Sequence, residues 1–296
     1  MGRQRGRIVH GIAVLDKPAG LSSNRALQQV RRTLDARKAG HTGTLDPFAT
    51  GMLVLCFGDA TKFSSYLLDS DKTYLAELRL GESTTTGDTE GEVTAQTAIP
   101  ALSEPVVAST LHSFLGDSEQ IPPMYSALKH KGQRLYDLAR RGEVVERPPR
   151  RIAISTIELV RLTDVTVTIR VRCSKGTYIR VLCEDIARSL GTVGHCSALR
   201  RESLGPFSAD QMMTQAELES AADPEALLMP VDAGIGHVAR YELDTPASID
   251  LQQGRTVRVD AADAPLVRAY REEEFLGLCT IENGVLQAVR LCATGD

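Results

Sequence analysis

Hydrophobic and polar residues alternate along two segments of the chain with the period of two that is typical of half-buried β-strands. In residues 165–173, five apolar side chains would face one side, with threonines and arginines between them. Residues 74–80 show the same alternation. A continuous apolar run at 52–57 predicts a buried strand, and residues 8–15 predict another.

Two further segments have the apolar spacing of amphipathic helices. Ser22 or Ser23 is expected to cap the first, whose apolar positions 26, 27, 30 and 34 share one face. The second is expected from about Tyr178 to a stop at Gly191. Because the isoleucine before Arg180 belongs to the apolar stripe of this helix, Arg180 itself can point toward a cleft.

Strands and helices interleave without a regular βαβ rhythm, which predicts an α+β fold built on a mixed, mainly antiparallel sheet. Residues from about 117 to 151 are basic and helical in part, and we expect them to be an insertion on this core. A boundary near residues 232–240 divides the chain into a catalytic domain, 1–236, and a small β-rich domain, 237–296.

Composition is that of an ordinary soluble protein, with 42% hydrophobic and 24% charged residues. The six cysteines occur singly, which favours reduced core thiols over a metal site and indicates a cytoplasmic protein. No apolar run approaches the ~20 residues that span a bilayer, and no apolar segment follows the basic start at 1–7 as in a signal peptide. Glycine-rich nucleotide-binding motifs are absent, so we expect no metal and no cofactor.

Charge is unevenly distributed along the chain. The overall net charge is −4, but residues 1–204 carry 28 Lys and Arg against 22 Asp and Glu, whereas residues 205–296 carry 6 against 16. Residues 121–151 hold eight basic and three acidic side chains. Such an excess can be a merely solvated face, but it also suits a phosphate backbone. The candidate RNA-binding residues are Lys129, Lys131, Arg134, Arg140, Arg141 and Arg150.

The segment 40–51, GHTGTLDPFATG, is the richest in potential chemistry. Its three glycines and one proline predict a tight loop rather than regular structure. The loop carries an imidazole, His41, and a carboxylate, Asp46, and leads directly into the buried strand at 52–57. A polar loop anchored by a core strand can hold reactive groups rigidly.

This loop resembles the G-H-x-G-x-L-D-P-x-A-x-G signature of the TruB family, the bacterial tRNA pseudouridine-55 synthases, with every fixed position present. The resemblance extends over about residues 10–205. The other segments that carry it are 15–24, 70–74, 80–81, 84–88, 121–129, 174–180 and 199–201.

The resemblance implies a pseudouridine synthase fold and the conversion of uridine 55 in the tRNA T-loop to pseudouridine, without a cofactor. Asp46 would be the catalytic nucleophile, whether it attacks C1′ or C6 or the reaction passes through a glycal. Arg180 would pair with Asp46 and keep it ionised, since an opposite charge at ~4–6 Å lowers such a pKa by ~1–3 units. Tyr74 would stack on the flipped uracil and help to move the C5 proton.

The remaining roles concern substrate binding. Tyr178 and Leu199 would line the pocket, and His41 would occupy the space left by the extruded base or stack on neighbouring bases. Lys17 would support the loop or contact phosphate.

The expected partner is tRNA, held at its T-arm and elbow by the basic insertion. We expect a monomer with no obligate protein partner and no membrane association. The small C-terminal domain would be PUA-like, although its acidity departs from an RNA-binding role. Two alternatives remain at this point: a non-enzymatic RNA chaperone, in which Asp46 is dispensable, and an RNA-guided relative that works inside a ribonucleoprotein.

Overall fold

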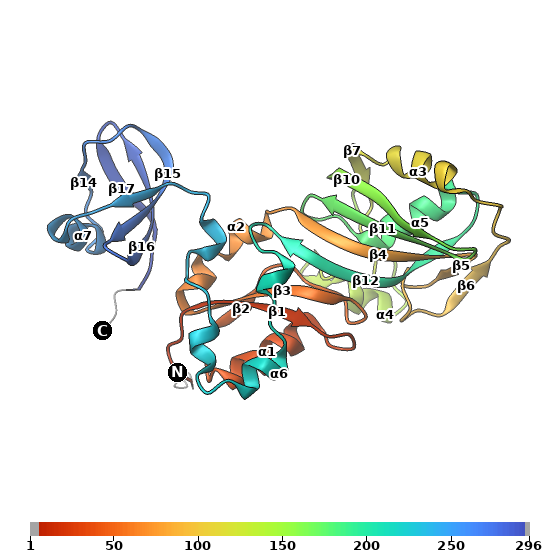
Figure 1. Ribbon diagram of the computed structural model, residues 1–296, viewed down its shortest axis with the longest axis horizontal. Helices are drawn as coiled ribbons and strands as arrows, with labels where there is room; N and C mark the ends of the chain where they lie inside the picture. Colours follow the sequence, from red (N-terminus) through yellow and green to blue (C-terminus); the bar gives the residue numbers. More distant parts are fainter. Residues whose placement is uncertain (1–5, 294–296) are drawn as a thin grey trace.

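The computed structural model describes residues 6–293, so the first five residues of the basic start lie outside the described residues. An eight-stranded sheet forms the centre, in the order β1-β3-β12-β4-β11-β10-β7, with β2 paired to β3 (Figure 1). All its pairs are antiparallel except β12 with β3. The predicted mixed, mainly antiparallel α+β fold is therefore confirmed. The strands are β1 (Gly11–Lys17), β2 (Ala39–His41), β3 (Thr50–Phe57), β4 (Lys72–Leu80), β7 (Gly116–Gln120), β10 (Arg150–Leu162), β11 (Thr166–Cys173) and β12 (Gly194–Leu204).

The alternating patterns locate β4 and β11 correctly. In β4 the side chains of Tyr74 and every second residue after it are buried, as predicted. Val165 was expected in β11 but precedes it and is 38% exposed, because it belongs to the turn that enters the strand. The first strand begins at Gly11 rather than Ile8, since its pairing with β3 runs from Gly11 to Lys17.

Helices cover one face of this sheet. Residues of α1 (Ser23–Thr33), α3 (Glu104–His112) and α5 (Ile179–Ser189) share one hydrophobic core with β3, β4, β11 and β12. Ser22 is the cap of α1, its side chain accepting from the Arg25 amide at 3.2 Å, which resolves the predicted choice between the two serines. The opposite face at β1 and β3 packs on α2 (Ser64–Leu68) and on the chain at 204–233.

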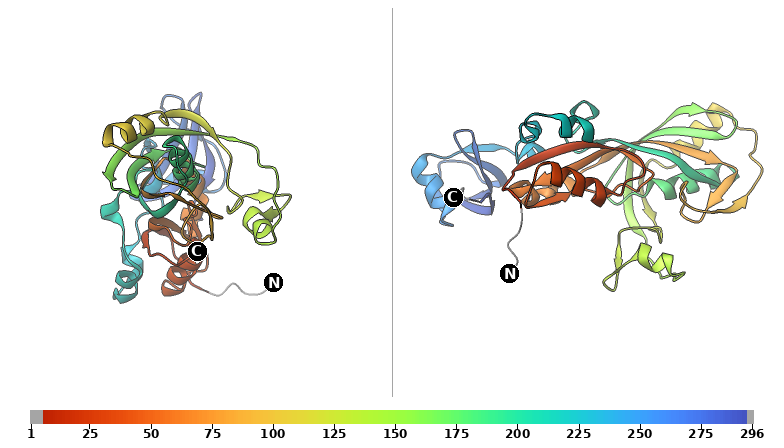
Figure 2. Two further views of the ribbon diagram at one scale, coloured as in Figure 1. Left: turned by 90° about the vertical axis from the view of Figure 1, so that its right-hand side faces the viewer. Right: turned by 90° about the horizontal axis from the view of Figure 1, so that it is seen from below.

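The insertion is shorter than predicted. Residues 116–120 form β7, which pairs with the start of β10 so that Gln120 faces Arg150; both ends of the predicted insertion thus belong to the main sheet. The excursion proper is 121–149, and it projects from the body as an arm (Figure 2). It contains β8 (Lys129–His130), β9 (Gln133–Arg134) and α4 (Leu135–Arg140).

A second, five-stranded sheet follows with its own hydrophobic core, as expected for a small C-terminal β-rich unit. It packs on the region of α2, where the Phe63 and Phe275 rings lie 5.3 Å apart and Lys62 donates to the Leu291 carbonyl at 3.0 Å. Its strands are β13 (Arg240–Glu242), β14 (Val257–Arg258), β15 (Ala264–Arg271), β16 (Glu274–Glu282) and β17 (Val285–Leu291).

The remaining elements are short. They are the hairpin β5 (Glu82–Thr84) and β6 (Val93–Gln96), the helices α6 (Gln215–Ser220) and α7 (Thr245–Gln252), and the 3-10 turns η1 (Gly58–Lys62), η2 (Ala209–Gln211), η3 (Pro224–Leu227) and η4 (Ala233–Ile235). Within residues 6–293, every helix is too short or too polar to cross a membrane.

Candidate active site

Asp46 lies in the loop between β2 and β3, and its neighbours on both sides are fixed by hydrogen bonds. Leu45 is held by the buried Ser23 side chain at the start of α1, which accepts from the Leu45 amide at 2.7 Å and donates to its carbonyl at 2.9 Å. The Pro47 carbonyl accepts from the Gly20 amide at 2.8 Å. The catalytic candidate therefore sits in a backbone segment with little freedom.

Lys17 supports the same loop through hydrogen bonds to backbone carbonyls. Its side chain is fully buried, and Nζ donates to the carbonyls of Pro18 and Leu21 at 2.8 Å and of Pro47 at 3.3 Å. Burial lowers the pKa of this amine to about 8. Of the two predicted roles, loop support fits this geometry, because the amine faces backbone carbonyls inside the protein; contact with phosphate stays a prediction.

The carboxylate of Asp46 is paired with Arg180. Arg180 Nε donates to Asp46 Oδ2 at 2.8 Å, and the guanidinium also donates to the carbonyls of Thr86 at 2.5 Å and Tyr125 at 2.6 Å. The Arg180 side chain is 4% exposed, whereas that of Asp46 is 33% exposed. The arginine is thus buried, whereas the sequence suggested that it points toward a cleft. Only the carboxylate is accessible to a substrate.

A second carboxylate, Asp88, shares this guanidinium, and sequence reasoning assigned it no role. Its Oδ2 lies 3.4 Å from Arg180 Nη1, and its Oδ1 accepts from the Thr86 hydroxyl at 2.5 Å and the Glu90 amide at 3.0 Å. Asp88 is 3% exposed. The 84–88 segment was among the family-like motifs, but nothing local in it indicates a partner at residue 180.

The balance of charges sets the protonation of Asp46. Burial raises the pKa of Asp46 above its ordinary value; the positive charge of Arg180 opposes this effect, and the nearby Asp88 carboxylate adds to it. Arg180 therefore lowers this pKa, as predicted, but burial outweighs its effect and the net shift is upward. Arg180 partly offsets the burial and aims the carboxylate.

Tyr74 and Leu199 come from adjacent strands, since β4 pairs with β12. Tyr74 is 8% and Leu199 7% exposed. Burial raises the pKa of the Tyr74 hydroxyl, which is therefore protonated at neutral pH. Tyr178 is positioned differently, at the N-terminal cap of α5, where the Gln120 side chain accepts from its amide at 2.7 Å and donates to its carbonyl at 3.1 Å. Gln120 is a further supporting residue without a sequence signal.

His41 ends β2 on the chain that leads to Asp46. Its Nδ1 is buried and has no hydrogen-bond partner among the described residues. Burial, and secondarily the charge of Arg201, lowers the pKa of this imidazole, so it is neutral near pH 7. A neutral ring without fixed partners suits stacking better than acid–base catalysis.

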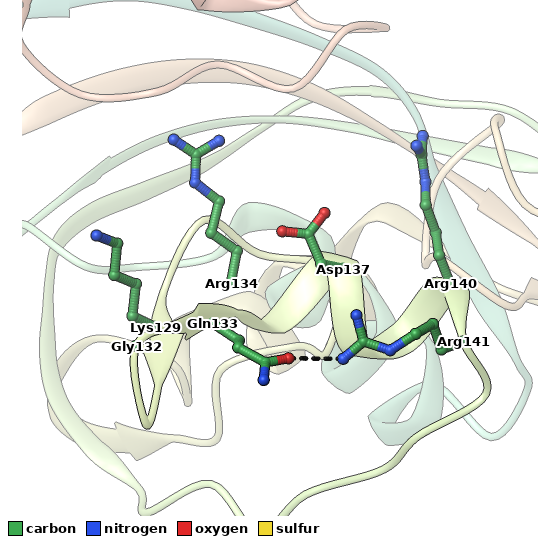
Figure 3. Close-up of a pocket in the computed structure, with 7 residues that line it drawn as sticks. All are labelled: Lys129, Gly132, Gln133, Arg134, Asp137, Arg140 and Arg141. Atoms are coloured by element: carbon green, nitrogen blue, oxygen red, sulfur yellow. Dashed lines mark hydrogen bonds between the residues drawn. The ribbon is translucent and has the colours of Figure 1, made fainter.

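Four basic residues of the arm, Lys129, Arg134, Arg140 and Arg141, line a surface pocket of about 540 Å³ (Figure 3). Arg134, Asp137 and Arg140 extend to one side of α4, and Arg141 instead donates to Gln133 at 2.7 Å. The lining residues are Lys129, Gly132, Gln133, Arg134, Asp137, Arg140 and Arg141. The other two predicted RNA contacts are not among the lining residues: Lys131 lies next to Gly132 in the β8–β9 turn, and Arg150 begins β10.

No cluster of three or more His, Cys, Asp or Glu side chains able to hold a metal ion occurs within the part of the chain that the structure describes.

Comparison with known proteins identifies the family. Residues 31–179 match the TruB family pseudouridylate synthase N-terminal domain, and residues 180–235 match the tRNA pseudouridylate synthase B C-terminal domain. A protein of Chromohalobacter salexigens named tRNA pseudouridine synthase B is 50% identical over 300 residues, covering 99% of this chain and 98% of that protein. One of the same name from Aromatoleum aromaticum is 49% identical over 295 residues, covering 99% and 96%.

Solved structures agree on the fold. The chain aligns with a crystal structure of a Cbf5–Nop10–Gar1 complex at a TM-score of 0.74 and 22% identity, covering 97% of this chain and 86% of that one. An H/ACA RNP bound to a substrate RNA containing 2′-deoxyuridine gives 0.72 and 21%, covering 99% and 92%. At these identities the likeness establishes fold alone. Taken with the sequence relatives, the chain belongs to the TruB family of pseudouridylate synthases and is an isomerase.

Proposed function

We propose that this protein converts uridine 55 in the T-loop of tRNA to pseudouridine, with Asp46 as the catalytic carboxylate. The observation that carries the proposal is the partly exposed Asp46 carboxylate, held at 2.8 Å by the buried Arg180 within the family's signature loop. Relatives named tRNA pseudouridine synthase B over nearly their whole length support the choice of tRNA.

The reaction needs no redox change. The C1′–N1 bond of the uridine breaks, the uracil turns, a C1′–C5 bond forms, and the C5 proton leaves as N1 gains one. Asp46 acts as nucleophile or stabilises charge at the sugar or base, by attack at C1′ or C6 or by a glycal route. Because Arg180 is fixed by Thr86 and Tyr125 as well, the carboxylate keeps its direction through these steps.

The walls of the pocket then have complementary tasks. Tyr74 stacks on the flipped uracil, and its protonated hydroxyl assists the transfer of the C5 proton. Tyr178 and Leu199 complete an apolar pocket that excludes water. The neutral His41 ring fills the space that the extruded base leaves in the RNA, which offsets part of the few kcal/mol of unstacking.

We further propose that the arm at 121–149 grips the T-arm and elbow of the tRNA. Its exposed cations Lys129, Arg134 and Arg140 lie around one pocket, where phosphates would replace counterions. In this proposal residues 1–236 form the catalytic domain and residues 237–296 a PUA-like domain. The second sheet and its separate core support that division.

Mapping the modified nucleotide tests the proposed position. An unmodified tRNA transcript is incubated with the protein, treated with a carbodiimide that forms stable adducts at pseudouridine, and read by reverse transcription. One stop next to position 55, absent from a transcript with cytidine there, is expected. Stops at other uridines with none at 55 would contradict the proposed site while leaving the isomerase activity intact.

A further inference from the structure

Arg201 in β12 is among the most deeply buried large side chains of the protein, at 1% exposure. No carboxylate in residues 6–293 lies within 4.0 Å of its guanidinium. Its neighbour Arg200, by contrast, forms two bonds with Asp16 at 2.9 and 2.8 Å. Burying an arginine without a counter-ion costs several kcal/mol, so the contacts of Arg201 must offset that cost.

The contacts of Arg201 lie on both sides of Asp46 in the chain. Arg201 Nε donates to the Met52 carbonyl at 2.6 Å, and Nη2 donates to the Gly43 carbonyl at 3.1 Å. The backbone of Arg201 also packs so closely on Gly51 that a Cβ there would lie 2.3 Å from the Arg201 carbonyl oxygen. One residue therefore joins the beginning of the Asp46 loop to its end.

The same residue also neighbours Tyr74, which is expected to stack on the base. Arg201 and Tyr74 are direct partners in the β12–β4 ladder, so their side chains project from the same face of the sheet. The positive charge of Arg201 lowers the pKa of the Tyr74 hydroxyl, against the larger effect of burial. The guanidinium thus lies between the loop that carries the carboxylate and the ring expected to stack on the base.

We propose that Arg201 is a positioning residue for the isomerisation. It fixes the Gly43–Met52 loop and Tyr74 relative to one another, so that Asp46 and the Tyr74 phenol act on the same uridine. This inference rests on the proposed function. It assigns Arg201 no contact with the substrate, and it follows that its removal should lower the rate of the chemical step while leaving tRNA binding intact.

The test compares Arg201→Lys with Arg200→Lys, the same change one residue earlier in the same strand. Lysine keeps the charge but cannot donate to two carbonyls from a planar fork. In single-turnover tritium release from C5-tritiated tRNA, Arg201→Lys should be slower by about 100-fold, with tRNA affinity within about twofold of wild type. Arg200→Lys should stay within about threefold, because a half-exposed ion pair contributes little.

Two further measurements separate positioning from general loss of structure. Tyr74→Phe and Arg201→Lys should combine less than additively, because both act through Tyr74. In free protein labelled with ¹³Cζ-tyrosine, the Tyr74 signal, assigned among the seven tyrosines with Tyr74→Phe, should move in Arg201→Lys but not in Arg200→Lys.

The proposal would be overturned if the Tyr74 signal did not move in Arg201→Lys, or if this variant released tritium at the wild-type rate. It would also be overturned if the rate fell only in proportion to the folded fraction or to tRNA affinity. Because the spectrum needs no RNA, it tests the Arg201–Tyr74 link even if the wild-type protein releases no tritium, a result that would instead overturn the proposed function.

Discussion

Arg180 Nε and Asp46 Oδ2 lie 2.8 Å apart although 134 positions separate the two residues in the chain. The arginine is buried and also faces Asp88, so one guanidinium forms ion pairs with two carboxylates. Of these three side chains, only Asp46 is substantially exposed. This arrangement makes the protonation of Asp46 depend on a residue that the substrate does not reach.

The first prediction concerns Asp88→Asn. Asp88 adds to the rise in the pKa of Asp46, so removing its charge should lower that pKa. In the proposed mechanism the ionised carboxylate is the active form, so activity should be lost as pH falls through the pKa of Asp46. The acid limb of the pH–rate profile should therefore move to lower pH. The maximal rate should fall by about 10- to 100-fold, because Arg180 loses a fixed partner. Asp185→Asn, a half-buried change in α5 whose carboxylate pairs with Arg188, should leave the limb in place.

A second prediction concerns Gly51→Ala. Gly51 has φ +92°, and a Cβ would lie 2.3 Å from the Arg201 carbonyl oxygen. We expect a loss of about 2–5 kcal/mol in the free energy of unfolding, from backbone strain plus steric overlap. Gly142→Ala, at φ +76° with nothing within 4 Å of its Cβ, isolates the strain and should cost about 1–2 kcal/mol. Equal losses in urea titrations of the two variants would refute the close contact at Gly51.

His41 should make stability depend on pH. Its folded pKa is lowered by burial, so the unfolded chain binds more protons below about pH 6.5 and the free energy of unfolding falls there. The contribution is at most about 1.4 kcal/mol per pH unit. His41→Gln should remove it, flattening stability between pH 5 and about 6.5 relative to wild type. The exposed His112→Gln should behave like wild type, and identical curves for all three proteins would exclude the effect.

If the arm binds tRNA, the affinity for tRNA should depend on salt concentration. Replacing Lys129, Arg134 and Arg140 together by Gln should weaken tRNA binding and reduce the slope of log K against log[salt] by about 2–3. Fluorescence anisotropy across a salt series measures this slope. Replacing Arg258 and Arg290 in the second sheet, together with Arg255 just before β14, removes the same charge far from the arm and serves as the control. A similar fall in slope for both triple variants would speak against the arm as the principal contact.

Much of the fold could be predicted because its signals are local. The alternation in β4 and β11 and the apolar stripe of α5 follow directly from which side chains are buried. The ends of the predicted insertion could not be placed, since 117–120 and 150–151 are polar edge segments whose strand character comes from pairing with each other. Pairing between residues some thirty positions apart leaves no periodic trace in one sequence.

The site divides in the same way. Family resemblance indicated Asp46 and Arg180 as partners, and the structure brings them together. Asp88 and Arg201 make their contacts with residues distant in sequence, so their types and spacing gave no indication of these contacts. The net rise in the pKa of Asp46 likewise depends on burial and on Asp88, which only three-dimensional packing determines.

The central claim is that Asp46 performs the isomerisation of a tRNA uridine. It is tested most directly by tritium release from C5-tritiated uridine in an unmodified tRNA transcript, comparing wild type with Asp46→Asn at equal occupancy of bound tRNA. We predict release by wild type and none above background by the variant, with tRNA affinity retained. Equal release by both proteins would contradict the role of Asp46, and no release by a folded wild type that binds the tRNA would contradict the proposed reaction on this substrate.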